Sequence, residues 1–132
     1  MAGVRVFFIL VLLSGFSGFA FSAFAVAQQP GSLDETVFFS DLEDIPLMPG
    51  LTELPDEALF FDKPEGRIVE QTALMEGVSR EDVLVFYGGV LTQLGWGRVS
   101  ESRFFRDREY LELLFDTQDG ADFVKITVRP AL

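Results

Sequence analysis

Carboxylates are the most abundant side chains in this sequence that could do chemistry. The chain has 21 Asp and Glu residues against 10 Lys and Arg residues, and it has neither His nor Cys. Their absence excludes Ser-His-Asp and Cys-His nucleophilic catalysis, the common zinc sites and the usual near-neutral general base. A hydrolase that uses two suitably spaced carboxyl groups remains as the alternative, but the sequence singles out no such pair.

Other chemistries have little support. The two lysines, Lys63 and Lys125, lie outside apolar runs of the kind that activate a lysine, and no glycine-rich phosphate-binding motif is present. The acidic residues around Gly120 resemble a calcium loop, but the Asp-x-Asp-x-Asp-Gly order is missing and position twelve is Thr127. We therefore predict no catalytic, cofactor-binding or metal-binding residue, and a protein that is not an enzyme.

The acidic residues are concentrated toward the N-terminal side of the chain. Residues 34–65 contain Lys63 as their one basic residue and ten carboxylates: Asp34, Glu35, Asp41, Glu43, Asp44, Glu53, Asp56, Glu57, Asp62 and Glu65. With a net charge of −11, nucleic acid and anionic lipid are poor partners, whereas a basic envelope protein or peptide would be attracted to this region. The alternative is a solvated surface that keeps a small exported protein soluble.

The first 27 residues have the three parts of a secretory signal peptide. Arg5 precedes an uncharged stretch, residues 6–27, that begins with a Leu, Phe and Val run and ends with Ala25-Val26-Ala27. We predict cleavage after Ala27 and export to the periplasm or beyond. The alternative is an uncleaved anchor, since this stretch is long enough to span a bilayer core of roughly 30 Å.

The exported part is expected to begin with an irregular region. Without cysteine it has no disulfide, so packing of its many Phe residues must hold the fold. We predict an extended acidic arm over residues 28–56, because Ile45-Pro46 and Met48-Pro49-Gly50 favour extended, turn-rich backbone. A compact domain over residues 57–132 follows.

The compact domain is predicted to begin with a hairpin and a helix. Residues 59–61 and 67–75 form two strands joined by Lys63-Pro64-Glu65-Gly66. Ser79 then caps a helix together with Asp82, and Gly95 ends it. The residues expected to form the apolar face of this helix are Val83, Phe86, Tyr87, Val90, Leu91 and Leu94. The adjacent Gly88 and Gly89 suggest that the helix backbone closely approaches the sheet.

Three further strands are predicted over residues 96–105, 110–116 and 123–129, with a type I′ hairpin at Asp119-Gly120. One face of the last two carries Leu111, Leu113, Phe115, Val124, Ile126 and Val128, and we expect it to pack on the helix. The opposite face is mixed: it is either a solvated face or a partner surface. Trp96 is either a core residue or an exposed sugar-stacking ring. The predicted fold class is α+β, an antiparallel sheet of about four or five strands with one helix on one face, in the order β-β-α-β-β-β.

Several motifs resemble a pattern found in small uncharacterised exported proteins of proteobacteria. They are Asp44-Ile45-Pro46-Leu47-Met48-Pro49-Gly50-Leu51, Phe61-Asp62-Lys63-Pro64-Glu65-Gly66-Arg67-Ile68-Val69, Phe86-Tyr87 and Leu94-Gly95-Trp96. The resemblance covers most of the chain after the leader. It implies an envelope location and the fold above, and it brings no activity and no functional residues.

Two hypotheses follow for function. The first is a non-catalytic periplasmic interaction or accessory module that meets a partner through its acidic arm or its open sheet face, and we favour it because of the leader, the charge asymmetry and the missing catalytic groups. The second is a carboxylate-based hydrolase, which requires two acidic side chains converging in a concave pocket. A module held at the membrane by an uncleaved leader is a variant of the first.

Overall fold

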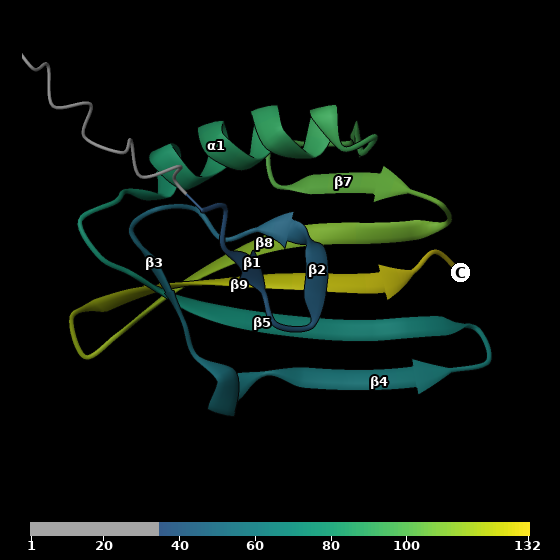
Figure 1. Cartoon of the computed structure of the whole chain (residues 1–132), viewed down its shortest axis with the longest axis horizontal. Helices are drawn as coiled ribbons and strands as arrows, with labels where there is room; N and C mark the ends of the chain where they lie inside the picture. Colours follow the sequence, from purple (N-terminus) through teal and green to yellow (C-terminus); the bar gives the residue numbers. More distant parts are fainter. Residues whose placement is uncertain (1–34) are drawn as a thin grey trace, which may run out of the picture. The chain divides into compact units, whose positions relative to one another are not determined.

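The longest strands form where apolar and polar residues alternate, and a single helix interrupts them. The computed structural model describes residues 35–132 (Figure 1). The predicted signal peptide and the first residues of the predicted arm lie outside this range. The elements are β1 (Phe38–Phe39), β2 (Leu42–Pro46), β3 (Leu51–Glu53), the 3-10 turn η1 (Pro55–Glu57), β4 (Leu59–Lys63), β5 (Gly66–Met75), α1 (Arg80–Gln93), β6 (Gly97–Arg98), β7 (Arg103–Arg106), β8 (Glu109–Gln118) and β9 (Ala121–Pro130).

The strands form two antiparallel sheets. The larger has seven strands in the order β3-β5-β9-β8-β7-β6, with β4 also paired to β5, and the smaller is the β1-β2 hairpin. The predicted α+β class, the antiparallel pairing and the helix are confirmed. The prediction of four or five strands is wrong.

The stretch predicted as one strand over residues 96–105 contributes one of the extra strands. It forms a hairpin of β6 and β7, because the backbone N–H groups of Val99 and Ser100 both donate to the carbonyl of Arg103, at 2.8 and 3.0 Å. The chain therefore turns back where simple β propensity predicts continuation.

The other extra strands come from the region predicted as an arm, and the described residues show no separate arm. Phe39, Leu42 and Ile45 are fully buried, and Leu51 in β3 pairs with Met75 at the end of β5. The acidic residues between these apolar positions face outward. Residues 38–53 thus belong to the same packed unit as the rest of the described chain.

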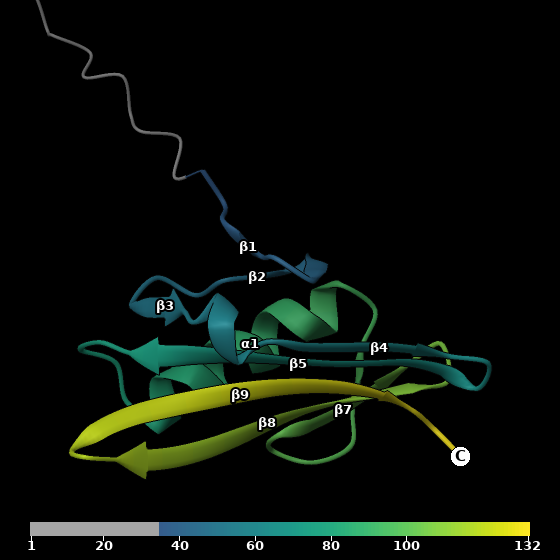
Figure 2. The ribbon, with the colours of Figure 1, turned by 90° about the horizontal axis from the view of Figure 1, so that it is seen from below.

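The core lies on one face of the large sheet. Rows of paired residues cross its centre, among them Val69, Val128, Leu111 and Phe104. The helix α1 and the β1-β2 hairpin cover this same face (Figures 1 and 2). The predicted inward positions on β8 and β9 are confirmed: all are buried except Phe115, which is partly buried.

The predicted caps of the helix are confirmed. Ser79 accepts from the backbone of Asp82 at 3.1 Å, while the Asp82 carboxylate accepts from the backbone of Ser79 at 2.8 Å. The hydrogen bond from the Ser79 backbone N–H, and after it the interaction with the Ser79 side chain, lower the pKa of Asp82. Gly95 follows the helix with a φ of +88°, the left-handed conformation expected there.

The apolar face of α1 differs from the prediction in two positions. The buried residues are Val83, Leu84, Tyr87 and Leu91, whereas Leu94 is exposed. Leu84 belongs to the same core cluster as Val83, Tyr87 and Leu91, which widens the buried stripe by one position. The three- and four-residue spacing alone does not predict this width.

The explanation expected for Gly88 and Gly89 is wrong. A Cβ at Gly88 would lie 3.2 Å from the guanidinium of Arg98, and one at Gly89 would meet nothing within 4 Å. Neither glycine is in close contact with sheet backbone. A different glycine has a tight site: Gly50 has a φ of +93°, and a Cβ there would lie 2.6 Å from Cγ1 of Val78.

These contacts predict opposite effects for two glycine-to-alanine changes. Gly50→Ala is expected to lower the free energy of unfolding by about 1–3 kcal/mol, because alanine there is both strained and crowded. Gly89→Ala is expected to raise it by about 0.5–1 kcal/mol, because alanine favours the helix and the site is open. Urea unfolding of both variants measures this, and a Gly50→Ala protein as stable as wild type would contradict the turn geometry.

Candidate functional site: the β4 edge

The motif residues that look most distinctive in the sequence form a structural hub around Tyr87. The buried Tyr87 hydroxyl donates to the carbonyl of Pro46 at 2.8 Å and accepts from the backbone N–H of Met48 at 3.1 Å. Burial raises the pKa of Tyr87 far above its ordinary value, so the hydroxyl stays protonated. These two bonds fix the segment after β2 to the helix.

A second group of contacts ties the same regions together through Arg106. Its guanidinium stacks 4.3 Å from the ring centre of Trp96, donates to the carbonyl of Leu94 at 3.0 Å and forms an ion pair with Asp44. Trp96 is buried, as one of the two predicted roles requires, and is not an exposed stacking ring. The motifs therefore hold the covering layer in place. A surface hollow beside them is lined by residues that include Val37, Met48 and Phe86, and Glu35 is its one ionisable residue.

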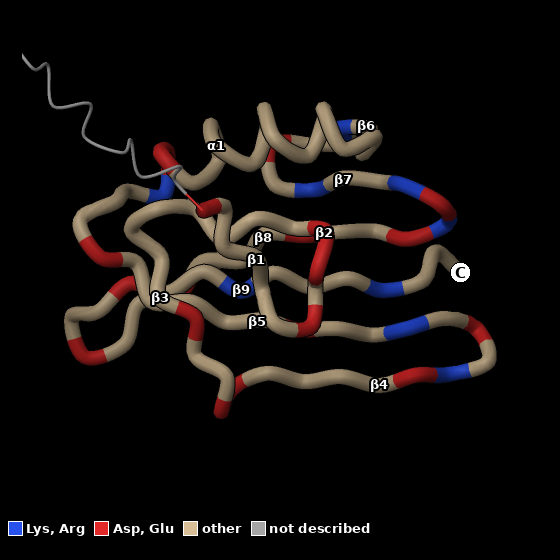
Figure 3. Tube along the Cα trace, viewed as in Figure 1, with Lys and Arg blue, Asp and Glu red and all other residues tan. Residues whose placement is uncertain are grey.

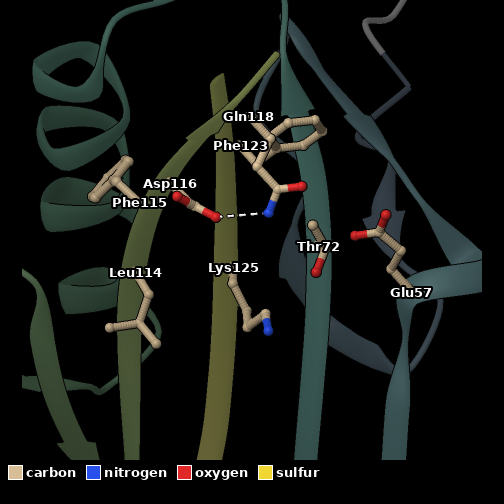
Figure 4. A pocket seen from close by; sticks show the side chains of 8 residues that line it. All are labelled: Glu57, Thr72, Leu114, Phe115, Asp116, Gln118, Phe123 and Lys125. Carbon is tan, nitrogen blue, oxygen red and sulfur yellow. Dashed lines mark hydrogen bonds between the residues drawn. The ribbon is translucent and has the colours of Figure 1, made fainter. Parts of the chain in front are cut away.

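The open face of the sheet has a shallow hollow of about 200 Å³. Its lining residues are Glu57, Thr72, Leu114, Phe115, Asp116, Gln118, Phe123 and Lys125 (Figure 4). Gln118 donates to Asp116 at 2.8 Å, whereas the carboxylate of Glu57 lies on the opposite side of the hollow. The two carboxylates do not converge on one point, as a paired-carboxylate mechanism would need.

The acidic turn near the C-terminus forms the predicted hairpin. Asp119 and Gly120 have φ values of +51° and +78°, as a type I′ turn requires. Thr117 donates its hydroxyl to Asp122 at 2.6 Å. Among residues 35–132, no three acidic side chains are grouped closely enough to hold a metal ion.

The most unusual feature is the outer edge of β4. Within the described chain β4 pairs with β5 alone, and it forms the lower border of the sheet in Figure 1. Lys63 and Gly66 flank a two-residue turn, and residues in that position form a hydrogen-bonded pair. Hydrogen-bonded and non-hydrogen-bonded pairs alternate along the two strands from there. Phe60 and Asp62 are in non-hydrogen-bonded pairs, so their backbone N–H and C=O groups point away from β5.

This edge is also apolar. All five residues of β4 are exposed, with Leu59 at 38%, Phe60 at 53% and Phe61 at 50% of full exposure. The opposite end of the sheet finishes in β6, which has only two residues. Proteins usually shorten, charge or cover an edge strand to prevent pairing with other chains, and the apolar half of β4 has none of these protections.

An acidic hollow adjoins β4 on the covered side. It is lined by Ser40, Asp41, Glu43, Asp44, Phe60 and Arg67. Figure 3 shows β2, with its acidic positions in red, in front of the sheet. Arg67 donates two hydrogen bonds to Glu109, at 2.9 and 3.2 Å, and these bonds raise the pKa of Arg67. The positive charge of Arg67 is therefore compensated by Glu109. Asp44 is paired with Arg106, which leaves Asp41 and Glu43 as the uncompensated charges.

Comparison with known proteins gives no assignment. No family model, no curated protein and no solved structure matches this chain. Within residues 35–132, no helix is long and apolar enough to cross a membrane. The functional argument therefore depends on the geometry of the β4 edge.

Sequence reasoning predicted the strand at residues 59–61 and the concentration of acidic residues. It did not predict that this strand would be an exposed sheet edge beside an acidic hollow. Phe60 and Phe61 look like core residues, since Phe-Phe pairs favour burial. Only the pairing of β5 with β9 on its other side places β4 at an edge. The acidic hollow likewise depends on β2 folding over the sheet.

Tyr87→Phe tests the hub. We expect the free energy of unfolding to fall by about 1–3 kcal/mol at pH 7, because the N–H of Met48 and the carbonyl of Pro46 lose their partner. The pKa of Tyr87 is raised above its ordinary value of 10.0 in the folded protein. Its contribution to wild-type stability is therefore complete below pH 10 and decreases as the pH rises above it.

Urea unfolding of both proteins between pH 7 and pH 11 measures the effect. The wild type should lose stability above pH 10 more steeply than the Phe variant. Equal slopes would show that the Tyr87 hydroxyl is not buried in the folded protein.

Proposed function

We propose that this protein is a non-catalytic, exported interaction or accessory module that binds an extended segment of a partner protein as an additional strand beside β4. The observation that supports this most strongly is the exposed apolar edge of β4, with the outward backbone groups of Phe60 and Asp62. An added strand would satisfy these groups and cover Phe60 and Phe61 at the same time.

The rest of the fold is suited to present this edge. β5 pairs with β9 over seven residues and with β4 over five, so the edge strand is fixed to a long central strand. The helix and the β1-β2 hairpin cover the sheet face without extending over β4 (Figure 1). A rigid edge of this kind binds a segment without reorganising, which reduces the free-energy cost of association.

The location of the module is proposed from the leader. The charge and residue pattern of residues 5–27 supports export to the periplasm with cleavage after Ala27. In the alternative the leader stays as an anchor and the module acts at the membrane surface. The proposed binding mode is the same in both cases.

Two substitutions at Asp62 separate backbone pairing from side-chain effects. Asp62→Pro removes the outward N–H without removing a bond to β5, since Asp62 and Arg67 form a non-hydrogen-bonded pair. Asp62→Ala removes the same carboxylate and keeps the N–H. We expect a partner captured from envelope extracts by wild type to be retained by Asp62→Ala and lost by Asp62→Pro.

Capture is measured by mass spectrometry of the retained proteins, with thermal unfolding to show that both variants fold. A partner that both variants retain equally would be binding elsewhere, and strand addition at β4 would be rejected.

A further inference from the structure

We infer that the segment bound at β4 alternates basic and apolar residues, with Lys or Arg side chains on the side of the β1-β2 hairpin and apolar side chains on the open side. This rests on the proposed strand addition, because the alternation is defined only for a strand in register with β4. These two kinds of side chain define the chemistry of the partner segment.

The hairpin side of β4 selects a basic residue. Phe60 is opposite Val69, which is buried in the core, so its side chain lies on the covered face and lines the acidic hollow. A partner residue opposite Phe60 would have its side chain on that same face. An extended Lys or Arg could lie along the Phe60 ring and place its charge near Asp41 and Glu43.

The charges of the hollow remain available for such a residue. Asp41 accepts a hydrogen bond from Gln71 at 2.7 Å, a neutral partner that leaves its charge uncompensated. Glu43 is exposed and makes no ion pair within the described part of the chain. The one cation of the hollow, Arg67, is held by Glu109.

The open side of β4 selects apolar residues. Leu59 and Phe61 are opposite Glu70 and Ile68, so their side chains lie on the face away from the hairpin. Phe61 and the half-buried Ile68 form an apolar strip at that end of the strand. A partner residue on this side would bury apolar surface, which stabilises by about 25 cal/mol per Å².

A second copy of this chain fits the edge poorly. Antiparallel pairing of two β4 strands about a two-fold axis perpendicular to the sheet would put both acidic hollows on the same face of the joined sheet. The carboxylates of Asp41 and Glu43 in both copies would then repel each other, in a protein whose net charge is already −11. Charge complementarity therefore favours a basic partner segment.

Three labelled peptides test the inference by fluorescence anisotropy with the protein purified from cells. The first is Thr-Lys-Val-Lys-Val-Lys-Val-Thr, the second has the same composition in blocks, Thr-Lys-Lys-Lys-Val-Val-Val-Thr, and the third replaces each Lys of the first with Ser. We expect the alternating Lys peptide to bind at least ten times more tightly than either of the others, at moderate salt.

Matched variants locate the charge effect. Glu43→Gln and Asp41→Asn should each weaken binding of the alternating Lys peptide severalfold and leave the Ser peptide unchanged. Glu101→Gln, in the loop before β7, removes one negative charge away from β4 and should have no effect. Asp62→Pro should abolish binding of both alternating peptides, whereas Asp62→Ala should keep the preference for Lys.

The outcomes distinguish the two proposals. If the Lys and Ser peptides bind equally and Asp62→Pro abolishes both, strand addition stands and the basic partner is rejected. If the block peptide binds as tightly as the alternating one, binding reflects net charge and the inference is rejected. If sedimentation shows a dimer that Asp62→Pro dissociates, the occupant of the edge is a second copy, which also overturns the inference.

Discussion

The buried hydroxyl of Tyr87 is the interaction on which the covering layer depends. It joins the middle of α1 to both sides of Leu47, through the carbonyl of Pro46 and the N–H of Met48. No disulfide links these segments, because the chain has no cysteine. The hairpin and the helix therefore stay together on one sheet face through this pair of bonds, the Arg106 contacts and apolar packing.

That constraint determines which surfaces remain open. With α1 and the β1-β2 hairpin on one face, the opposite face and the β4 edge are left to solvent. The β3 strand, which follows the hub, pairs with the far end of β5 on the same side as β4. The chain thus occupies one half of that edge of β5 with β3 and the other half with β4, and β4 is the exposed outer strand.

Local features of the fold were predictable from the sequence. The capping box at Ser79, the turn at Asp119-Gly120 and the alternation on β8 and β9 each depend on neighbouring residues, and the structure confirms them. The β1-β2 hairpin and β3 were missed because their stability comes from contacts with the helix and β5, distant in sequence. Prolines at positions 46 and 49 favour extended backbone whether or not that backbone packs.

The candidate site was less predictable than the fold for the same reason. The excess of carboxylates before residue 66 was visible, but the sequence could not show that Asp44 would be paired with Arg106 while Glu43 would not. Likewise Phe60 and Phe61 have the composition of a core strand. Their exposure follows only from the order of strands in the sheet, which depends on pairing between β5 and β9, whose partners lie far apart in the sequence, from Val69 with Val128 to Met75 with Asp122.

The distribution of residues along β4 is itself an argument for a specific partner. Asp62, Lys63 and Pro64 occupy one end of the strand and its turn, and such residues normally protect an edge against uncontrolled pairing. They leave Leu59, Phe60 and Phe61 unprotected at the other end. An added strand therefore pairs with Phe60 and Asp62 and does not continue past the turn, and the acidic hollow on one face and the apolar strip on the other make its two faces unequal. A strand with equal faces would not discriminate between them, whereas a strand with one basic and one apolar face fits only with its basic face toward the hollow, which excludes every shift by an odd number of residues.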